Sequence, residues 1–362
     1  MYLATHRFGT RTWRRDLAAG LALLLSIGAW SCGDSAQQSP QPAQSPAAER
    51  ESVTLEFGAF SAAHEACSTR LLPAFGRQWQ HLNGQELRFS ERYEGSEALT
   101  RAIADGLRID VAVLALSRDV EQLVAAGMVG ADWRDAPNHG VVARSIVVLA
   151  VRKGNPRDIH DWTDLARPGV KIVMADPATS GGGIWFVSAI YGAALRGHVG
   201  VAAGDPAAAR GFVAQVLANV VERKASADES FKSFQSGVGD VAITYESQLA
   251  FGWMVGRDEQ RVIPASTALV EHPAVLLGPN ADAHRVRAAA AGLLAFLWTT
   301  EAQKIIATCG LRPVDPAVAA DAAQLFPTPQ DLWTIEDLGG WSQVSRDLLI
   351  PSGLAAPSVP PK

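Results

Sequence analysis

Short apolar segments alternate with amphipathic segments along most of this chain from Val53 onward. The run 145–151 (SIVVLAV) is continuously apolar, as in a strand buried on both faces, and 283–298 has the spacing of a surface helix. This alternation predicts an α/β fold without internal repeats. The other strands that we expect are 53–58, 87–93, 110–116, 171–174, 242–245 and 275–277, and the other helices are 64–80, 96–105, 119–126, 301–309 and three stretches between 174 and 242.

Length and charge restrict the class of protein. The 362 residues exceed one ordinary core and predict two lobes with appendages, and 48% hydrophobic with 19% charged residues is a globular composition. The net charge is -5, and removing residues 1–31, which carry +3, leaves about -8. An acidic chain without a stripe of Lys and Arg repels nucleic acid, so we expect no nucleic-acid partner.

The first 31 residues have the pattern of a signal peptide. Four arginines precede the apolar run 17–30, which is shorter than the ~20 residues that span a bilayer as a helix. No later segment is long and apolar enough to span a membrane. The pattern predicts export, with the rest of the chain outside the bilayer.

The apolar run ends in Ala29-Trp30-Ser31-Cys32, which resembles the lipobox of bacterial lipoproteins. This resemblance implies a lipid on Cys32 that holds the protein to a membrane on the periplasmic side. The alternative is a buried or disulfide-forming cysteine behind an ordinary signal peptide. Residues 32–51 are rich in Ser, Gln, Pro and Ala, which predicts a flexible tether, and the Pro-rich tail 351–362 is expected to be loose.

Two further cysteines, Cys67 and Cys309, remain in the mature chain. In an oxidising periplasm they are candidates for one disulfide. Two buried free thiols are the alternative, because sequence does not show whether their Cα atoms come within bonding range.

Motifs for catalysis or metal binding are absent from the sequence. There is no Gly-x-x-x-x-Gly-Lys loop, no His-Glu-x-x-His and no Cys-x-x-Cys, and the eight histidines are scattered. The pair His160-Asp161 fits a solvated helix cap better than a catalytic dyad. We therefore expect no enzyme, no metal and no cofactor.

Small hydroxyl or glycine residues recur between a strand and the helix that follows it. They are Ser61, Gly95-Ser96 and the run 180–183 (SGGG). Each puts free N–H groups at the positive end of a helix, and glycine lets a ligand approach the backbone closely. Such turns can bind an anion without a charged side chain. Each one taken singly is equally well an ordinary N-cap.

At these residues the chain resembles the sulfate-binding proteins of bacterial ABC transporters, over 52–353. The matching stretches are 57–60 (FGAF), 151–156 (VRKGNP), 159–162 (IHDW), Leu165, 167–170 (RPGV), 176–182 (DPATSGG), 237–241 (GVGDV) and 339–341 (GGW). The resemblance implies the type II periplasmic-binding-protein fold: two α/β lobes joined by hinge strands around a ligand cleft. By this likeness lobe 1 comprises 52–143 and 249–350, the latter with a C-terminal wrap, and lobe 2 comprises 144–248.

The resemblance also implies the binding residues and the partners. The expected ligand-binding residues are Ser61 and Ser96 from lobe 1, Ser180, Gly181 and Gly182 from lobe 2, and also Ser226 and Tyr245. A monomer would capture sulfate and deliver it to a membrane permease. Sulfate is fully ionised at neutral pH and has only acceptor oxygens, so its site should offer donors alone. A carboxylate there would instead accept a proton from monohydrogen phosphate and reject sulfate.

The chain departs from the family pattern at four places. Glu97 stands where the family has Gly, Ser226-Ala227-Asp228 where it has Ala-Arg-Gly, Ile184 where it has a basic residue, and Tyr245 where it has Trp. We expect Glu97 and Asp228 to face solvent as first-turn helix residues. The alternative is a changed ligand, such as phosphate, thiosulfate or molybdate. A receptor that senses its ligand without transport is a further alternative.

Overall fold

The computed structural model describes residues 52–254 and 258–353, which belong to one compact unit. The predicted signal peptide, Cys32, the tether 32–51 and residues 354–362 of the tail lie outside the described residues. Across the described part, no helix has the length and apolar character needed to cross a membrane.

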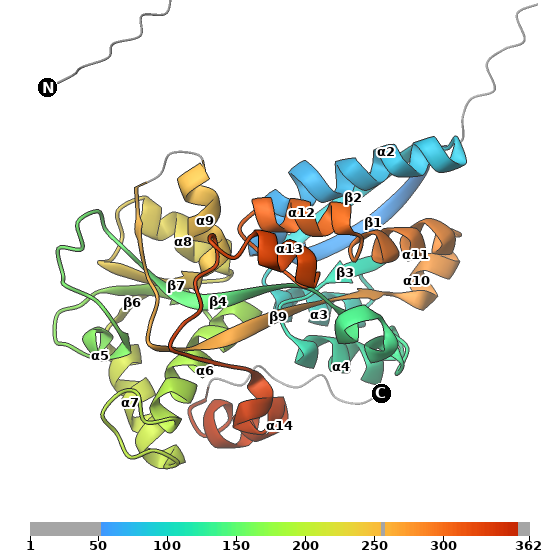
Figure 1. Ribbon diagram of the computed structural model, residues 1–362. Coiled ribbons are helices and arrows are strands. Elements are labelled where there is room, and N and C mark those ends of the chain that lie inside the picture. The colour runs from blue at the N-terminus through green and yellow to red at the C-terminus, as the bar shows by residue number, and fades with distance from the viewer. Residues whose placement is uncertain (1–51, 255–257, 354–362) are drawn as a thin grey trace, which may run out of the picture. The chain divides into compact units, whose positions relative to one another are not determined.

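One mixed sheet runs through the described unit in the order β2-β1-β3-β9-β4-β7-β5-β6 (Figure 1). The strands of this path are β1 (Val53–Phe60), β2 (Leu87–Glu94), β3 (Val111–Val113), β4 (Val141–Val151), β5 (Ile172–Ala175), β6 (Val220–Lys224), β7 (Val241–Tyr245) and β9 (Ser266–Leu276). Three short strands pair off this path, namely β8 (Gln260–Val262), β10 (Arg312–Pro313) and β11 (Asp331–Trp333).

The long strands β4 and β9 join the two halves of the sheet. They are antiparallel to each other, and β9 also pairs with β3 while β4 also pairs with β7. Within each half the strands β1, β2 and β3, and β5, β6 and β7, run parallel. This arrangement makes β4 and β9 the strands through which one half can turn against the other.

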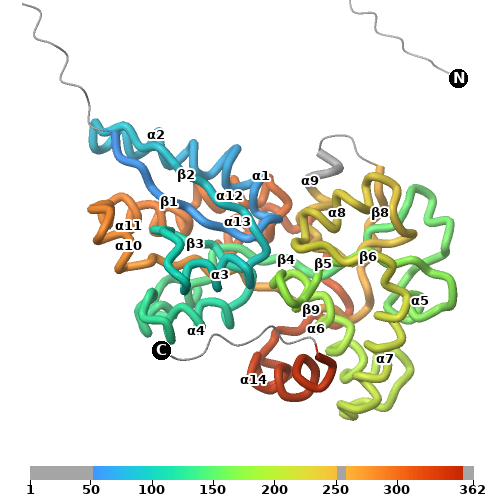
Figure 2. The backbone as a smooth tube through the Cα atoms, turned by 180° about the vertical axis from the view of Figure 1, so that it is seen from behind, coloured from blue at the N-terminus to red at the C-terminus, as the bar shows by residue number. Residues whose placement is uncertain are grey.

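Helices cover both faces of each half, as the alternation of buried strand residues requires (Figures 1 and 2). In the β1 half, Val111 and Val113 pack in the core with α2 and α11, whereas Ala112 packs with α3 and α4. In the β5 half, α6 and α7 cover one face and α8 the other. The helices named are α2 (Leu72–Asn83), α3 (Ser96–Ala104), α4 (Ser117–Ala125), α6 (Gly181–Leu195), α7 (Pro206–Ala218), α8 (Ala227–Gln235) and α11 (Arg287–Phe296).

The prediction for β9 is wrong in extent, since the strand covers eleven residues and only 275–277 were expected. Glu271, His272 and Pro273 break the apolar pattern, and proline is unusual in a central strand. The register shifts where Pro273 pairs with β4, and a bulge tolerates the missing N–H there. Glu271 accepts a hydrogen bond of 3.1 Å from the guanidinium of Arg144 on the facing strand β4. Strand β4 also begins earlier than predicted, at Val141 and not at residue 145.

Other predicted elements are interrupted. The expected helix 64–80 consists of α1 (His64–Ala66), a π-helical turn (Cys67–Leu71) and α2. The expected helix 283–298 is shortened to α11, because α10 (Gly278–Ala283) ends where it was expected to begin. Arg285 between them has a φ of 59°, a left-handed conformation that no helix continues through. Strand β6 was missed because it is short and half-exposed, and the remaining expected helix 301–309 appears as α12 (Thr300–Thr308).

The C-terminal segment returns over the β5 half. Strand β11 pairs with β9, and α14 (Gly340–Val344) places the Trp341 ring 4.7 Å from that of Trp185 in α6. The Arg210 guanidinium of α7 donates to the Asp347 carbonyl at 2.7 Å. This segment therefore packs against the α6 and α7 layer.

Cys67 and Cys309 are both buried and both free thiols in the structure. They belong to one hydrophobic cluster, and burial, followed by the charge interaction with Cys309, raises the pKa of the Cys67 thiol. The disulfide between these two neighbours stays a prediction.

Candidate functional site

The starts of α3, α6 and α8 meet at the boundary between the two halves of the sheet. A methyl group added at Gly181 would lie 3.1 Å from the Ser96 Cβ, and one added at Gly182 would lie 3.1 Å from the Ala227 Cβ. At Gly95 it would lie 2.3 Å from the Thr179 carbonyl oxygen. Because only glycine fits such approaches, the sequence lets three backbones come together here.

Several backbone N–H groups at this meeting point have no acceptor among the described residues. The first N–H groups of a helix have no partner inside it. The N–H group of the third residue of each helix has an acceptor. Ala98 donates to the Thr179 carbonyl at 3.2 Å, and Gly183 and Glu229 donate to the hydroxyl oxygens of their capping serines. The backbone N–H groups that have no acceptor among the described residues are those of Ser96, Glu97, Gly181, Gly182 and Ala227.

Ser180 is the N-cap of α6. Its Oγ accepts from the Gly183 N–H at 3.4 Å, and the side chain is 2% exposed. No described residue accepts its hydroxyl proton. The hydroxyl can therefore donate to a ligand that lies at the start of the helix.

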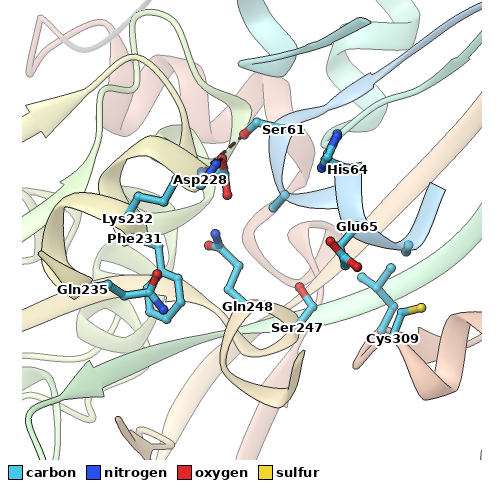
Figure 3. Close-up of a pocket in the computed structure, with 13 residues that line it drawn as sticks. Ser61, His64, Glu65, Asp228, Phe231, Lys232, Gln235, Ser247, Gln248 and Cys309 are labelled. Atoms are coloured by element: carbon cyan, nitrogen blue, oxygen red, sulfur yellow. Dashed lines mark hydrogen bonds and ion pairs between the residues drawn. The ribbon is translucent and has the colours of Figure 1, made fainter. Parts of the chain in front are cut away.

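Ser61 and Ser226 lie on either side of the start of α8. The Asp228 N–H donates to the Ser61 Oγ at 3.3 Å, so the end of β1 is linked to α8 (Figure 3). The Ser226 Oγ caps α8 by accepting from the Glu229 N–H at 3.2 Å. Both serine oxygens thus position α8, and Ala227 between them keeps a free N–H.

Ser96 differs from the other serines because its hydroxyl is fully used. It donates to the Asp119 carboxylate and accepts from the Ala115 N–H at 2.9 Å. An anion at this helix start would therefore meet the N–H groups of Ser96 and Glu97 and not the Ser96 hydroxyl.

Tyr245 ends β7 with its side chain fully buried. Its Oη has no hydrogen-bond partner among the described residues and lies 3.2 Å from the position that a Cβ on Gly182 would take. Burial, with a smaller contribution from the Asp119 charge, raises the pKa of the phenol well above its ordinary value. Tyr245 therefore keeps its proton and can donate it to a ligand.

The expectation that Glu97 faces solvent is wrong, because its side chain is 1% exposed and lies beside Asp119 and Arg118. The position of Glu97 in the first turn of α3 did not reveal that α4 covers this face of the helix. Asp228 is one-third exposed and pairs with Lys232 at 2.6 Å, and Ile184 lies in the core. The sequence also missed Asp119, which has the ordinary pattern of a first-turn acid and gave no signal.

A separate polar pocket lies beside the Ser61 end of this site (Figure 3). Its polar lining comprises Ser61, His64, Glu65, Asp228, Lys232, Gln235, Ser247 and Gln248, and Cys309 lies at one edge. Ser61 is the one predicted binding residue that lines it. Acidic, basic and amide groups share this lining, so its composition does not select an anion.

The fold and this meeting of helix starts define a two-lobed solute-binding protein of the type II class. Residues 61–312 match the family described as bacterial extracellular solute-binding protein. The chain belongs to the bacterial sulfate-binding protein family, and the family is one of binding proteins, not enzymes.

Curated relatives cover most of the chain. It is 34% identical to a sulfate-binding protein of Synechococcus elongatus, over 93% of each chain. It is 31% identical to the sulfate-binding protein of Escherichia coli, over 76% of this chain and 83% of that one. A thiosulfate-binding protein of Pseudomonas aeruginosa is also 31% identical, over 78% of this chain and 85% of that one.

Solved structures agree on the fold. The sulfate-binding protein SubI of Mycobacterium tuberculosis superposes with a TM-score of 0.74 at 34% identity, covering 82% of this chain and 99% of that one. A molybdate-binding protein of Azotobacter vinelandii has a TM-score of 0.52 at 17% identity, covering 71% of this chain and 98% of that one. The second likeness concerns the fold alone.

Proposed function

We propose that this protein captures sulfate between its two lobes and delivers it to the permease of an ABC uptake system. The observation that carries the proposal is the set of free neutral donors at the meeting helix starts. Five backbone N–H groups and the hydroxyls of Ser180 and Tyr245 have protons that no described residue accepts. A buried dianion needs such donors in place of water.

A second candidate is another oxyanion held by the same donors. Thiosulfate is supported by the thiosulfate-binding relative, which is as similar as the Escherichia coli sulfate-binding protein. Phosphate is favoured by the buried carboxyl groups of Glu97 and Asp119, since a carboxylate can accept the proton that monohydrogen phosphate carries. Molybdate is a third oxyanion with the same charge and only acceptor oxygens.

Isothermal titration of the mature protein with sulfate, thiosulfate, molybdate and phosphate tests these candidates. The proposal expects the lowest Kd for sulfate. A lower Kd for one of the other three anions would reassign the ligand within the same fold. Absence of heat and of thermal stabilisation with all four would contradict both candidates, because a bound anion must stabilise the folded state.

The cellular setting is a proposal of the same kind. We take the chain to be an exported monomer, lipid-anchored through Cys32, with lobe boundaries at 52–143, 144–248 and 249–350. The pairing of β9 with β3 supports returning the third segment to lobe 1 from β9 onward, and the C-terminal wrap then lies on the α6 and α7 layer of lobe 2. Loss of sulfate uptake on gene deletion would support transport, whereas intact uptake with a lost signalling response would favour a sensor.

A further inference from the structure

Two carboxyl groups are buried together behind the start of α3. Glu97 is 1% exposed and Asp119, from the start of α4, is fully buried. One Asp119 oxygen accepts from the Ser96 hydroxyl, whereas its other oxygen and the Glu97 Oε2 have no hydrogen-bond partner among the described residues. Unpaired buried carboxylate oxygens are costly, so this pair is poised to keep a proton.

The charges around the pair do not balance two ionised carboxylates. Arg118 is the one basic group that pairs with them in the described part of the chain, and its Nη1 lies 3.9 Å from the Glu97 Oε2. Burial first, and then repulsion by Glu97, raise the pKa of Asp119 to about 8, against smaller lowering effects of Ser96 and Arg118. At neutral pH Asp119 therefore keeps its proton.

The pair adjoins the proposed anion site. Ser96 is bonded to Asp119, and its Cβ lies 3.1 Å from where a Cβ on Gly181 would be. Charged and titratable groups face the pair from α4 (Arg118) and from the end of β7 (Tyr245), whereas α6 begins with three glycines and adds none. His272 of β9 lies farther off, 5.6 Å from the Tyr245 ring.

We propose that Glu97 and Asp119 share a proton that the bound oxyanion requires, so that this chain takes up a proton when it captures a divalent anion at high pH. The inference rests on the proposed function. A dianion beside the pair makes loss of its proton more costly, so binding and protonation favour each other. The shared proton also explains how two buried acids coexist with a sulfate site, because the pair then carries one negative charge and not two.

Titration of the mature protein with sulfate at pH 6, 7, 8 and 9, in pairs of buffers with different ionisation enthalpies, tests the inference. Sulfate itself stays fully ionised over this range, so the protein alone can supply a pH effect. We expect no proton uptake at pH 6, uptake of up to one proton near pH 8 to 9, and a Kd that rises by up to about tenfold per pH unit there.

Glu97→Gln should abolish both the uptake and the rise in Kd, and Glu97→Gly serves as a second variant if the glutamine variant does not fold. Glu121→Gln on α4, the helix that carries Asp119, changes an exposed residue paired with Arg134 and should keep both effects. A wild-type Kd that is constant from pH 6 to 9 without proton uptake would overturn the inference and leave the proposed function intact. Absence of binding at every pH would overturn both.

Discussion

The backbone N–H of Asp228 donates a hydrogen bond of 3.3 Å to the hydroxyl oxygen of Ser61. Ser61 follows β1 in one half of the sheet and Asp228 lies in the first turn of α8 in the other. A second hydrogen bond, of 2.9 Å from the Thr179 hydroxyl to the Ala225 carbonyl, joins the segments that precede α6 and α8. The Ser61 bond holds the start of α8, and with it the free Ala227 N–H, against the first half.

Replacement of Ser61 by alanine removes this link and also a hydroxyl proton that no described residue accepts. We expect Ser61→Ala to weaken sulfate binding by about 0.5–1.5 kcal/mol, the usual net value of a neutral hydrogen bond. Titration calorimetry measures the change. Ser236→Ala, at the exposed end of α8, is the matched control and should leave the Kd unchanged. An unaltered Kd in Ser61→Ala would show that the link does not support binding.

Ser180 should contribute more than Ser61, because its hydroxyl lies at the start of α6 beside the free N–H groups of Gly181 and Gly182. Ser180→Ala is expected to cost about 1.5–3 kcal/mol of binding free energy, as for a hydrogen bond to a charged group. It also removes the α6 cap, so thermal unfolding without ligand must be measured alongside. Ser180→Thr keeps the hydroxyl and should retain most of the affinity. Equal affinities of the alanine variant and the wild type would exclude Ser180 from the site.

The sequence alone was sufficient for the α/β class and for the local turns at Ser61, Gly95-Ser96 and 180–183, whereas Ser226 at the start of α8 was expected only from the family resemblance. Each turn combines a strand end with a small residue at a helix start, and these are local patterns. It was not sufficient for β9, because Glu271, His272 and Pro273 disrupt the apolar pattern that identifies a central strand. Only the partner strand β4, with its bulge and Arg144, accommodates those residues.

The meeting of the turns, and the burial of Glu97, depend on packing between segments distant in sequence. Glu97 in the first turn of α3 has the same local pattern as a solvent-facing acid, and only the contact between α3 and α4 buries it. Likewise the Ser96 hydroxyl looks like a ligand donor until Asp119 is found bonded to it. Local sequence indicates which residues lie at a helix start, but not what covers them.

Tyr245 allows a test in which binding and stability change in different directions. Its buried hydroxyl has no described partner, so Tyr245→Phe should leave the free protein equally stable or more stable by about 1 kcal/mol. If the hydroxyl donates to the anion, the same variant should weaken binding by about 1.5–3 kcal/mol. Urea unfolding and calorimetry of the two proteins give the two values. A variant that is less stable and binds normally would assign the hydroxyl a structural role.

The lipid anchor is tested at Cys32. Cys32→Ser removes the thiol that would carry the lipid, so the protein should move from the membrane fraction to the soluble periplasmic fraction. Immunoblots of fractionated cells measure the distribution. Cys309→Ser is the control and should stay with the membranes, because that cysteine is buried in the folded unit. Persistent membrane association of Cys32→Ser would contradict the anchor.

His272 predicts how stability changes in mild acid. Its ring is fully buried, stacked 4.3 Å from Phe60, and neither ring nitrogen has a described partner. Burial lowers the pKa of His272 to about 3, whereas in the unfolded chain it returns to about 6.5. The unfolded state therefore binds a proton that the folded state excludes, and stability falls as the pH drops from about 6.5 toward 3.

Between pH 7 and pH 5 this single group should remove about 2 kcal/mol of unfolding free energy from the wild type. His272→Leu keeps the ring's apolar surroundings filled and cannot titrate, so its stability should decline less over the same interval. Urea unfolding of both proteins at pH 7, 6 and 5 gives the two slopes. The remaining titratable groups are common to both proteins, so the difference between slopes isolates His272. Identical slopes would mean that the imidazole is hydrated or partnered in solution.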